Sequence, residues 1–99
     1  MGNGEKVLVI GRNTVMLQKI VGLLKLNKYD AVGTHQNNEA ISLFEREQPK
    51  AVIIGGGVDN ESRKTFHTEF LKRNKNIKLI DAQPQTVLYD LQKTLANNF

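Results

Sequence analysis

Two short glycine-containing segments hold the residue types best suited to binding an anion. The first is Gly11-Arg12-Asn13-Thr14, and the second is Gly55-Gly56-Gly57. Each follows a run of apolar residues that predicts a buried strand. Consecutive glycines let backbone N–H groups converge on an anion, and an arginine adds a positive charge beside them. The two segments predict a site for phosphate, sulfate or a nucleotide, formed by Arg12, Asn13, Thr14, Gly55, Gly56 and Gly57.

A simpler explanation is that these glycines form ordinary loops. Glycine-rich turns are common between helices and strands, and we favour this structural explanation. Asn13 and Met16 stand where a dinucleotide-binding motif has its second and third glycines. No Gly-Lys-Ser/Thr sequence follows the first predicted strand, so the motif of a P-loop is absent as well. We therefore expect no cofactor.

The remaining polar residues predict neither catalysis nor metal binding. His35 and His67 are the only histidines, they belong to different predicted elements, and the chain has no cysteine to complete a metal shell. The acidic residues near His67 are typical of a solvated helix surface. Neither serine ends a predicted strand or lies in a Gly-x-Ser-x-Gly motif. We expect no catalytic residue and no metal site.

Length and composition predict one soluble domain over residues 1–99. The chain is 39% hydrophobic and 24% charged, which is enough for a single core but not for two. The lack of cysteine excludes a disulfide scaffold and a thiol nucleophile. Its glycine-free apolar runs reach only four residues, far below the ~18–20 that span a bilayer. Residues 1–4 are expected to form a flexible lead-in, and the expected compartment is the cytoplasm.

The net charge of +4 is concentrated in one stretch of the chain. Between Arg63 and Lys78 there are six basic residues and a single acid, Glu69, which gives a local charge of +5. A phosphate-rich partner would be attracted to such a stretch. No DNA- or RNA-reading motif accompanies it, and its two aromatic residues, Phe66 and Phe70, are expected in the core. Solvated helix ends explain the charge better, so we do not expect nucleic-acid binding.

The hydrophobic pattern predicts four strands that alternate with four helices. The predicted strands are Lys6–Ile10, Tyr29–Thr34, Ala51–Ile54 and Ile77–Ile80. The first predicted helix runs from a cap at position 13 or 14 to about 26, and the second from caps at 37 and 38 to 47. The third covers about 60–73, and Pro84 opens the last. Because crossover units of this kind join parallel strands, the expected fold is an α/β three-layer sandwich with helices on both faces of the sheet.

Helix caps and inward faces follow from residue type and spacing. Asn13 or Thr14 is expected to cap the first helix, and Asn37 and Asn38 the second. The apolar stripe of the first helix is expected to include Val15 at its border. The third helix is expected to be anchored by Phe66, Phe70 and Leu71.

Three consecutive segments share a pattern with one known family. They are Tyr29-Asp-Ala-Val32, Asn38-Glu-Ala-Ile-Ser-Leu-Phe44 and Gln48-Pro-Lys-Ala-Val-Ile-Ile54. Together with Val7-Leu-Val-Ile10 they resemble the receiver domain of two-component response regulators, in which a "GY-x-V" strand precedes an "EAL" helix and a "PDLVLLD" segment. The resemblance covers residues 5–57 well and the rest loosely. It implies a flavodoxin-like parallel sheet with the strand order 2-1-3-4.

The residues on which receiver chemistry depends are replaced in this chain. Receivers hold Mg²⁺ with a pair of acids where this chain has Gly11 and Arg12, and they accept phosphate on an aspartate where it has Gly55. Asp81-Ala82 replaces their Thr/Ser–Ala pair, and Gln83-Pro84 is the nearest match to their Lys-Pro pair. Mg²⁺ needs oxygen ligands and an acyl phosphate needs a carboxylate. The resemblance therefore implies a degenerate receiver that is neither phosphorylated nor bound to Mg²⁺.

The chain is also one strand–helix unit shorter than a receiver. A shortened sheet leaves an unpaired strand edge, which is expected at Ile77, Lys78, Leu79 and Ile80. We expect a homodimer or another protein partner to bind there. The leading hypothesis is a non-catalytic receiver-like domain that signals by protein contact. The alternative is a small module that binds an anion or nucleotide through Arg12 and the 55–57 glycines.

Overall fold

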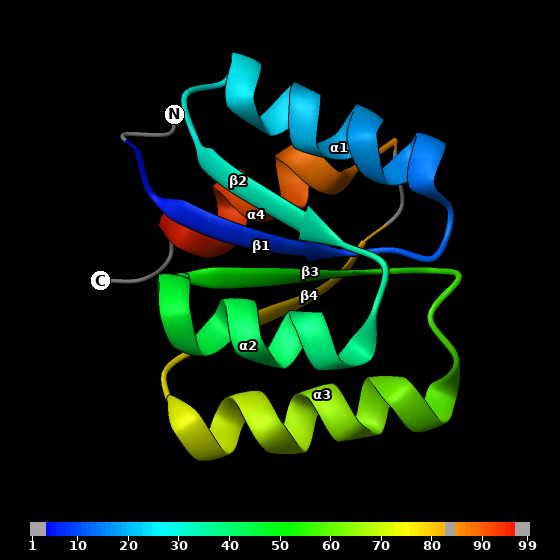
Figure 1. Cartoon of the computed structure of the whole chain (residues 1–99). Coiled ribbons are helices and arrows are strands. Elements are labelled where there is room, and N and C mark those ends of the chain that lie inside the picture. The colour runs from blue at the N-terminus through cyan, green and yellow to red at the C-terminus, as the bar shows by residue number, and fades with distance from the viewer. Residues whose placement is uncertain (1–3, 83–84, 97–99) are drawn as a thin grey trace.

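The computed structural model describes residues 4–82 and 85–96, and it shows a parallel four-stranded sheet between two layers of helices (Figure 1). Strands and helices alternate along the chain in the order β1 (Lys6–Ile10), α1 (Thr14–Leu26), β2 (Asp30–Thr34), α2 (Asn37–Glu47), β3 (Ala51–Gly55), α3 (Asn60–Arg73), β4 (Lys78–Ala82) and α4 (Val87–Ala96). The strand order is β2-β1-β3-β4. The predicted α/β sandwich with the order 2-1-3-4 is confirmed.

The four strands are parallel and in register, so their carboxyl ends lie at the same edge of the sheet. Ile10 at the end of β1 lies opposite Thr34 of β2 and Ile54 of β3. Gly55 at the end of β3 lies opposite Ala82 of β4. The loops that leave β1 and β3 therefore start side by side, which is the arrangement that places a ligand in this class of fold.

Each face of the sheet has its own hydrophobic core. Alternate side chains of a strand point to opposite faces, so Val7 and Val9 pack beneath α1 and α4, whereas Leu8 and Ile10 pack beneath α2 and α3 (Figure 1). Strands covered on both faces have no polar side, which explains the unbroken apolar runs in the sequence. On the α2–α3 side, the Phe70 ring stacks on the rings of Phe44 and Phe66, and its centroid lies 4.4 Å from the first and 5.5 Å from the second.

The predicted cap of α1 is confirmed, but those of α2 are wrong. Asn13 caps α1 by accepting a hydrogen bond from the Met16 N–H at 3.1 Å. In α2 the N-cap position is Gln36, whose side chain makes no capping bond. Asn37 is the first residue of the helix, and its side chain bonds to other elements instead.

Two apolar side chains expected in the core are exposed. Val15 is 61% exposed and Leu71 is 44% exposed. The helix residues that face the cores are others, namely Leu17, Ile20 and Leu24 in α1 and Phe66 and Phe70 in α3. Leu71 is turned about 100° from Phe70 around the helix axis, which directs it past the sheet.

Several further expectations concern the ends of elements. Tyr29 and Ile77 precede β2 and β4 rather than opening them, and both are buried. Of the predicted lead-in, Gly4 donates its N–H to the Lys28 carbonyl at 2.9 Å, whereas residues 1–3 lie outside the described residues. The predictions for Gln83 and Pro84 also lie outside them. No helix among residues 4–82 and 85–96 is both long and apolar enough to cross a membrane.

Candidate functional site

The loops after β1 and β3 form a pocket of about 220 Å³ at the carboxyl edge of the sheet, which we call the crevice. Its rim consists of the two glycine-containing loops, and its floor is apolar, made by strand β1 and helix α1. The lining residues are Gly11, Arg12, Asn13, Gly55, Gly56 and Gly57 at the rim and Val9, Ile10, Met16, Leu17 and Ile20 at the floor.

The structure brings five of the six predicted anion-binding residues to the crevice. The sixth, Thr14, lies instead in a separate groove of about 540 Å³ between α1 and β2. None of the three consecutive glycines has a positive φ. The N–H of Val58, which follows them, donates to the Gly55 carbonyl at 3.2 Å and so closes a turn. These loops therefore lack the alternating right- and left-handed backbone of an anion nest.

Arg12 bonds to the protein's own oxygen atoms. One guanidinium nitrogen, Nη1, donates to the His35 carbonyl at 2.7 Å, and the other, Nη2, donates to Oδ1 of Asn37 at 2.5 Å. The same Nη2 lies 3.7 Å from the Asp59 carboxylate, which compensates its charge. Arg12 thus ties the loop after β1 to the loop after β2, to the start of α2 and to the cap of α3.

Asp59 and Asn37 complete this polar network between the two helices of one layer. Asp59 caps α3 and accepts a hydrogen bond from the Ser62 N–H at 3.0 Å. The hydrogen bonds from Ser62 lower the pKa of the Asp59 carboxyl below its ordinary value, and Arg12 adds to the effect. Asn37 donates through Nδ2 to the Ser62 hydroxyl at 3.0 Å. The network holds the amino-terminal ends of α2 and α3 together.

Arg63 has specific partners that the charge pattern of the sequence does not predict. It is expected at a solvated helix end, yet its Nη2 donates to the carbonyls of Gly55 at 2.8 Å and Val58 at 3.1 Å. Its Nη1 pairs with the Asp81 carboxylate of β4. Arg63 therefore joins the loop after β3 to the border strand. A cation near the amino end of a helix opposes the helix dipole, and this was the available signal that Arg63 has specific partners.

The residues that follow β1 and end β3 do not fit Mg²⁺. Gly11 and Gly55 have no side-chain oxygen, and Arg12 places a cation where the metal would need ligands. The Asp59 carboxylate beside Arg12 already accepts the Ser62 N–H. Across residues 4–82 and 85–96, no three histidine, aspartate or glutamate side chains gather closely enough to hold a metal ion.

The predicted interface residues lie at and beside the last strand of the sheet. Ile77 and Ile80 are buried, one in each core, while Lys78 and Leu79 are half-buried. The apolar side chains of this border therefore belong to the domain's own packing. What the border offers to a partner is its backbone edge and the charged side chains beside it.

No protein-family model matches this chain, and no curated protein is a significant match to it.

Proposed function

We propose that this chain is a non-catalytic, receiver-like domain that acts by protein contact and is neither phosphorylated nor bound to Mg²⁺. The observation that carries the proposal is the bonding of Arg12 and Arg63 at the carboxyl edge of the sheet. Their guanidinium groups donate to the carbonyls of His35, Gly55 and Val58. Donors that would otherwise hold an anion are already used within the fold.

The residue types at this edge support the same proposal. An acyl phosphate forms only on a carboxylate, and the position that would supply it is Gly55. A methyl group at Gly55, the last residue of β3, would already make a tight contact of 3.3 Å with the backbone oxygen of Ile10. The sheet order 2-1-3-4 is compatible with a receiver-like origin, although a fold alone does not assign a function.

Phosphoryl donors test this proposal directly. The protein is incubated with Mg²⁺ and either acetyl phosphate or beryllofluoride, and it is then examined by intact mass and by thermal unfolding. We expect no phosphoryl adduct and no change in Tm, while an ordinary phosphorylatable receiver treated in parallel shows both. An Mg²⁺-dependent adduct, or an Mg²⁺-dependent rise in Tm with beryllofluoride, would refute the proposal.

The crevice itself favours a second candidate function, the binding of a small anion or nucleotide. It gathers Arg12, Asn13 and the glycines at 55–57 around one pocket. In a thermal-shift series with phosphate, sulfate and nucleotides, this function requires a rise in Tm that Arg12→Ala abolishes in a variant that remains folded. If no anion raises the Tm of the unaltered protein, this second function is excluded.

A further inference from the structure

One edge of β4 has no described strand beside it. The order β2-β1-β3-β4 places β4 at the border, and within residues 4–82 and 85–96 only β3 pairs with it. The Lys78 N–H points toward the Lys50 carbonyl, 3.5 Å away, on the β3 side. Because alternate residues of a strand turn their N–H and C=O groups to opposite sides, those of Leu79 and Asp81 face the outer edge. Two donors and two acceptors are therefore placed for a further strand.

A groove runs beside this edge, between β4 and α3. Its volume is about 550 Å³, and its lining consists of Asn60, Arg63, Lys64, His67 and Thr68 from α3 and Asp81 from β4. Helical periodicity places the exposed Leu71 on the same side of α3 as Lys64 and His67. The side chains of an added strand that face α3 would therefore contact mostly polar and basic groups, and Leu71 would be the one apolar residue beside them.

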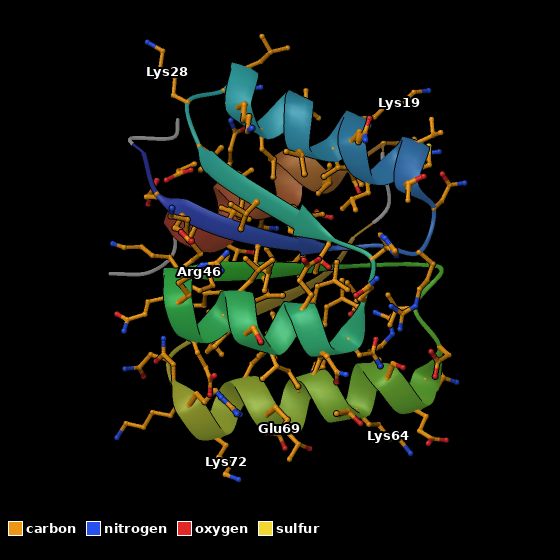
Figure 2. The ribbon with its side chains drawn as sticks, in the orientation of Figure 1. Lys19, Lys28, Arg46, Lys64, Glu69 and Lys72 are labelled. Carbon is orange, nitrogen blue, oxygen red and sulfur yellow. The ribbon has the colours of Figure 1, made fainter. Side chains whose placement is uncertain are left out.

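The charge of this border is positive and largely uncompensated. Lys64, Lys75 and Lys78 have no ion-pair partner among the described residues, whereas Arg63 in the same stretch pairs with Asp81. Lys64 lines the groove together with Asp81, and Figure 2 shows its side chain on the outer side of α3. Because Arg63 already neutralises Asp81, the acidic side chains of a segment in the groove would meet the free charge of Lys64. The complementary partner is therefore acidic.

A second copy of this chain fits the edge less well than an acidic partner. Two β4 strands related by a two-fold axis would pair antiparallel and would place both α3 helices on the same face of a joined sheet. The lysines on the β4 side of each α3, such as Lys64, would then approach lysines of the other copy. Like charges brought together in this way oppose association.

We propose that β4 binds an extended, acidic segment of a partner protein as a fifth strand of the sheet. This inference rests on the proposed function as an interaction domain and adds the chemistry of the partner. Main-chain hydrogen bonds to Leu79 and Asp81 supply the affinity, as in other cases of strand addition. Lys64, which lines the groove on the α3 side, selects a segment with acidic residues at the alternate positions that face α3.

A synthetic peptide serves as the probe. It has eight residues that alternate glutamate with valine and carries a fluorescent label, and its control replaces every glutamate with lysine. We expect saturable binding of the acidic peptide by fluorescence anisotropy, no binding of the basic one, and an affinity that falls as salt is added. In hydrogen-exchange NMR, the acidic peptide is expected to slow exchange at the Leu79 and Asp81 amides and to leave the core of β1 unchanged.

Two pairs of variants separate the backbone contribution from the charge contribution. Asp81→Pro and Asp81→Ala both remove the Arg63 partner, but only proline removes the outward N–H, and proline is tolerated on an edge strand. We expect Asp81→Pro to weaken peptide binding about tenfold relative to Asp81→Ala. Lys64→Glu should weaken binding more than Lys19→Glu, an identical charge change on α1, which covers the other face (Figure 2).

Several results would overturn this inference. They are equal binding of the two peptides, no binding of the acidic peptide, equal effects of Lys64→Glu and Lys19→Glu, and protection of the Leu79 and Asp81 amides that depends on protein concentration alone. The last result would assign the edge to a second copy of the chain. Any of them, without an Mg²⁺-dependent adduct, removes this inference and leaves the non-catalytic assignment intact. An Mg²⁺-dependent adduct removes the proposed function itself.

Discussion

The crevice and the β4 border both carry basic side chains, but they use them in opposite ways. At the crevice, Arg12 donates to the His35 carbonyl and to the Asn37 side chain, and it forms an ion pair with Asp59. At the border, Lys64 and Lys78 have no ion-pair partner among the described residues. Hydrogen bonds made within the chain stabilise the fold, whereas charges without internal partners remain for another molecule. Whether a basic side chain is already bonded within the fold therefore indicates, better than its presence alone, where another molecule can bind.

Arg63→Ala is expected to have the largest effect, because Arg63 bonds both regions to each other. The change removes the hydrogen bonds to the Gly55 and Val58 carbonyls and leaves Asp81 unpaired. We expect a loss of about 2–3 kcal/mol in the free energy of unfolding, measured by urea titration. Lys64→Ala, the neighbouring residue, should cost less than about 0.5 kcal/mol. Equal losses for the two variants would remove the distinction between the regions.

Arg12→Ala tests the crevice alone. The change breaks the bonds to the His35 carbonyl and Asn37, which are more exposed to solvent than those of Arg63, so we expect a loss of about 1–2 kcal/mol. Arg12→Lys keeps the charge but not the two-nitrogen geometry, and it should recover less than half of that loss. A fully stable Arg12→Ala protein would show that the guanidinium is free to bind a ligand.

Two neighbouring glycines of the crevice are expected to respond with opposite signs. In Gly55→Ala the new methyl group lies 3.3 Å from the Ile10 backbone oxygen, and we expect a loss of about 1 kcal/mol. In Gly56→Ala it meets nothing within 4 Å, and φ is not positive. Alanine there restricts the unfolded chain and should add about 0.4–1 kcal/mol. Thermal unfolding of both variants measures the difference, and losses of similar size would show that the loop is tightly packed throughout.

The smallest expected effect is a pH dependence that belongs to the crevice and not to the border. The pKa of Asp59 is lower in the folded than in the unfolded protein, so the unfolded chain binds more protons in acid. The stabilisation is therefore present above about pH 4, near the unfolded pKa, and is lost as the pH falls through the folded pKa. Asp59→Asn keeps a capping side chain and should reduce the slope of the acid limb, to which Glu47 and Glu69 also contribute, whereas Lys78→Gln should leave that slope unchanged. An unaltered acid limb in Asp59→Asn would contradict this assignment.

Much of the fold follows from local sequence patterns. Three helices have the predicted bounds or nearly so, because their ends depend on nearby residues such as Asn13 and on the unfavourable helical geometry before Pro49. The parallel sheet follows from the lengths of the crossovers. The exposure of Leu71 does not follow from its apolar side chain, because it depends on how α3 lies on the sheet.

The candidate site was predictable in position but not in bonding. Parallel strands bring their carboxyl ends together, so the meeting of Gly11 with Gly55 could be foreseen. Arg12, however, bonds to partners 23 and 25 residues away in the chain, and Arg63 to partners 5, 8 and 18 residues away. Such bonds depend on how the strands and helices are set against one another. No spacing within the sequence encodes them.

The outward backbone of β4 also has a consequence for how the protein behaves at high concentration. An edge strand that accepts a partner can equally template aggregation by other copies of the same chain. The lysines beside β4 oppose that outcome through repulsion, and salt screens repulsion between exposed charges. Low ionic strength should therefore keep the purified protein in solution. Polyanions and concentrated salt should favour its precipitation along this edge.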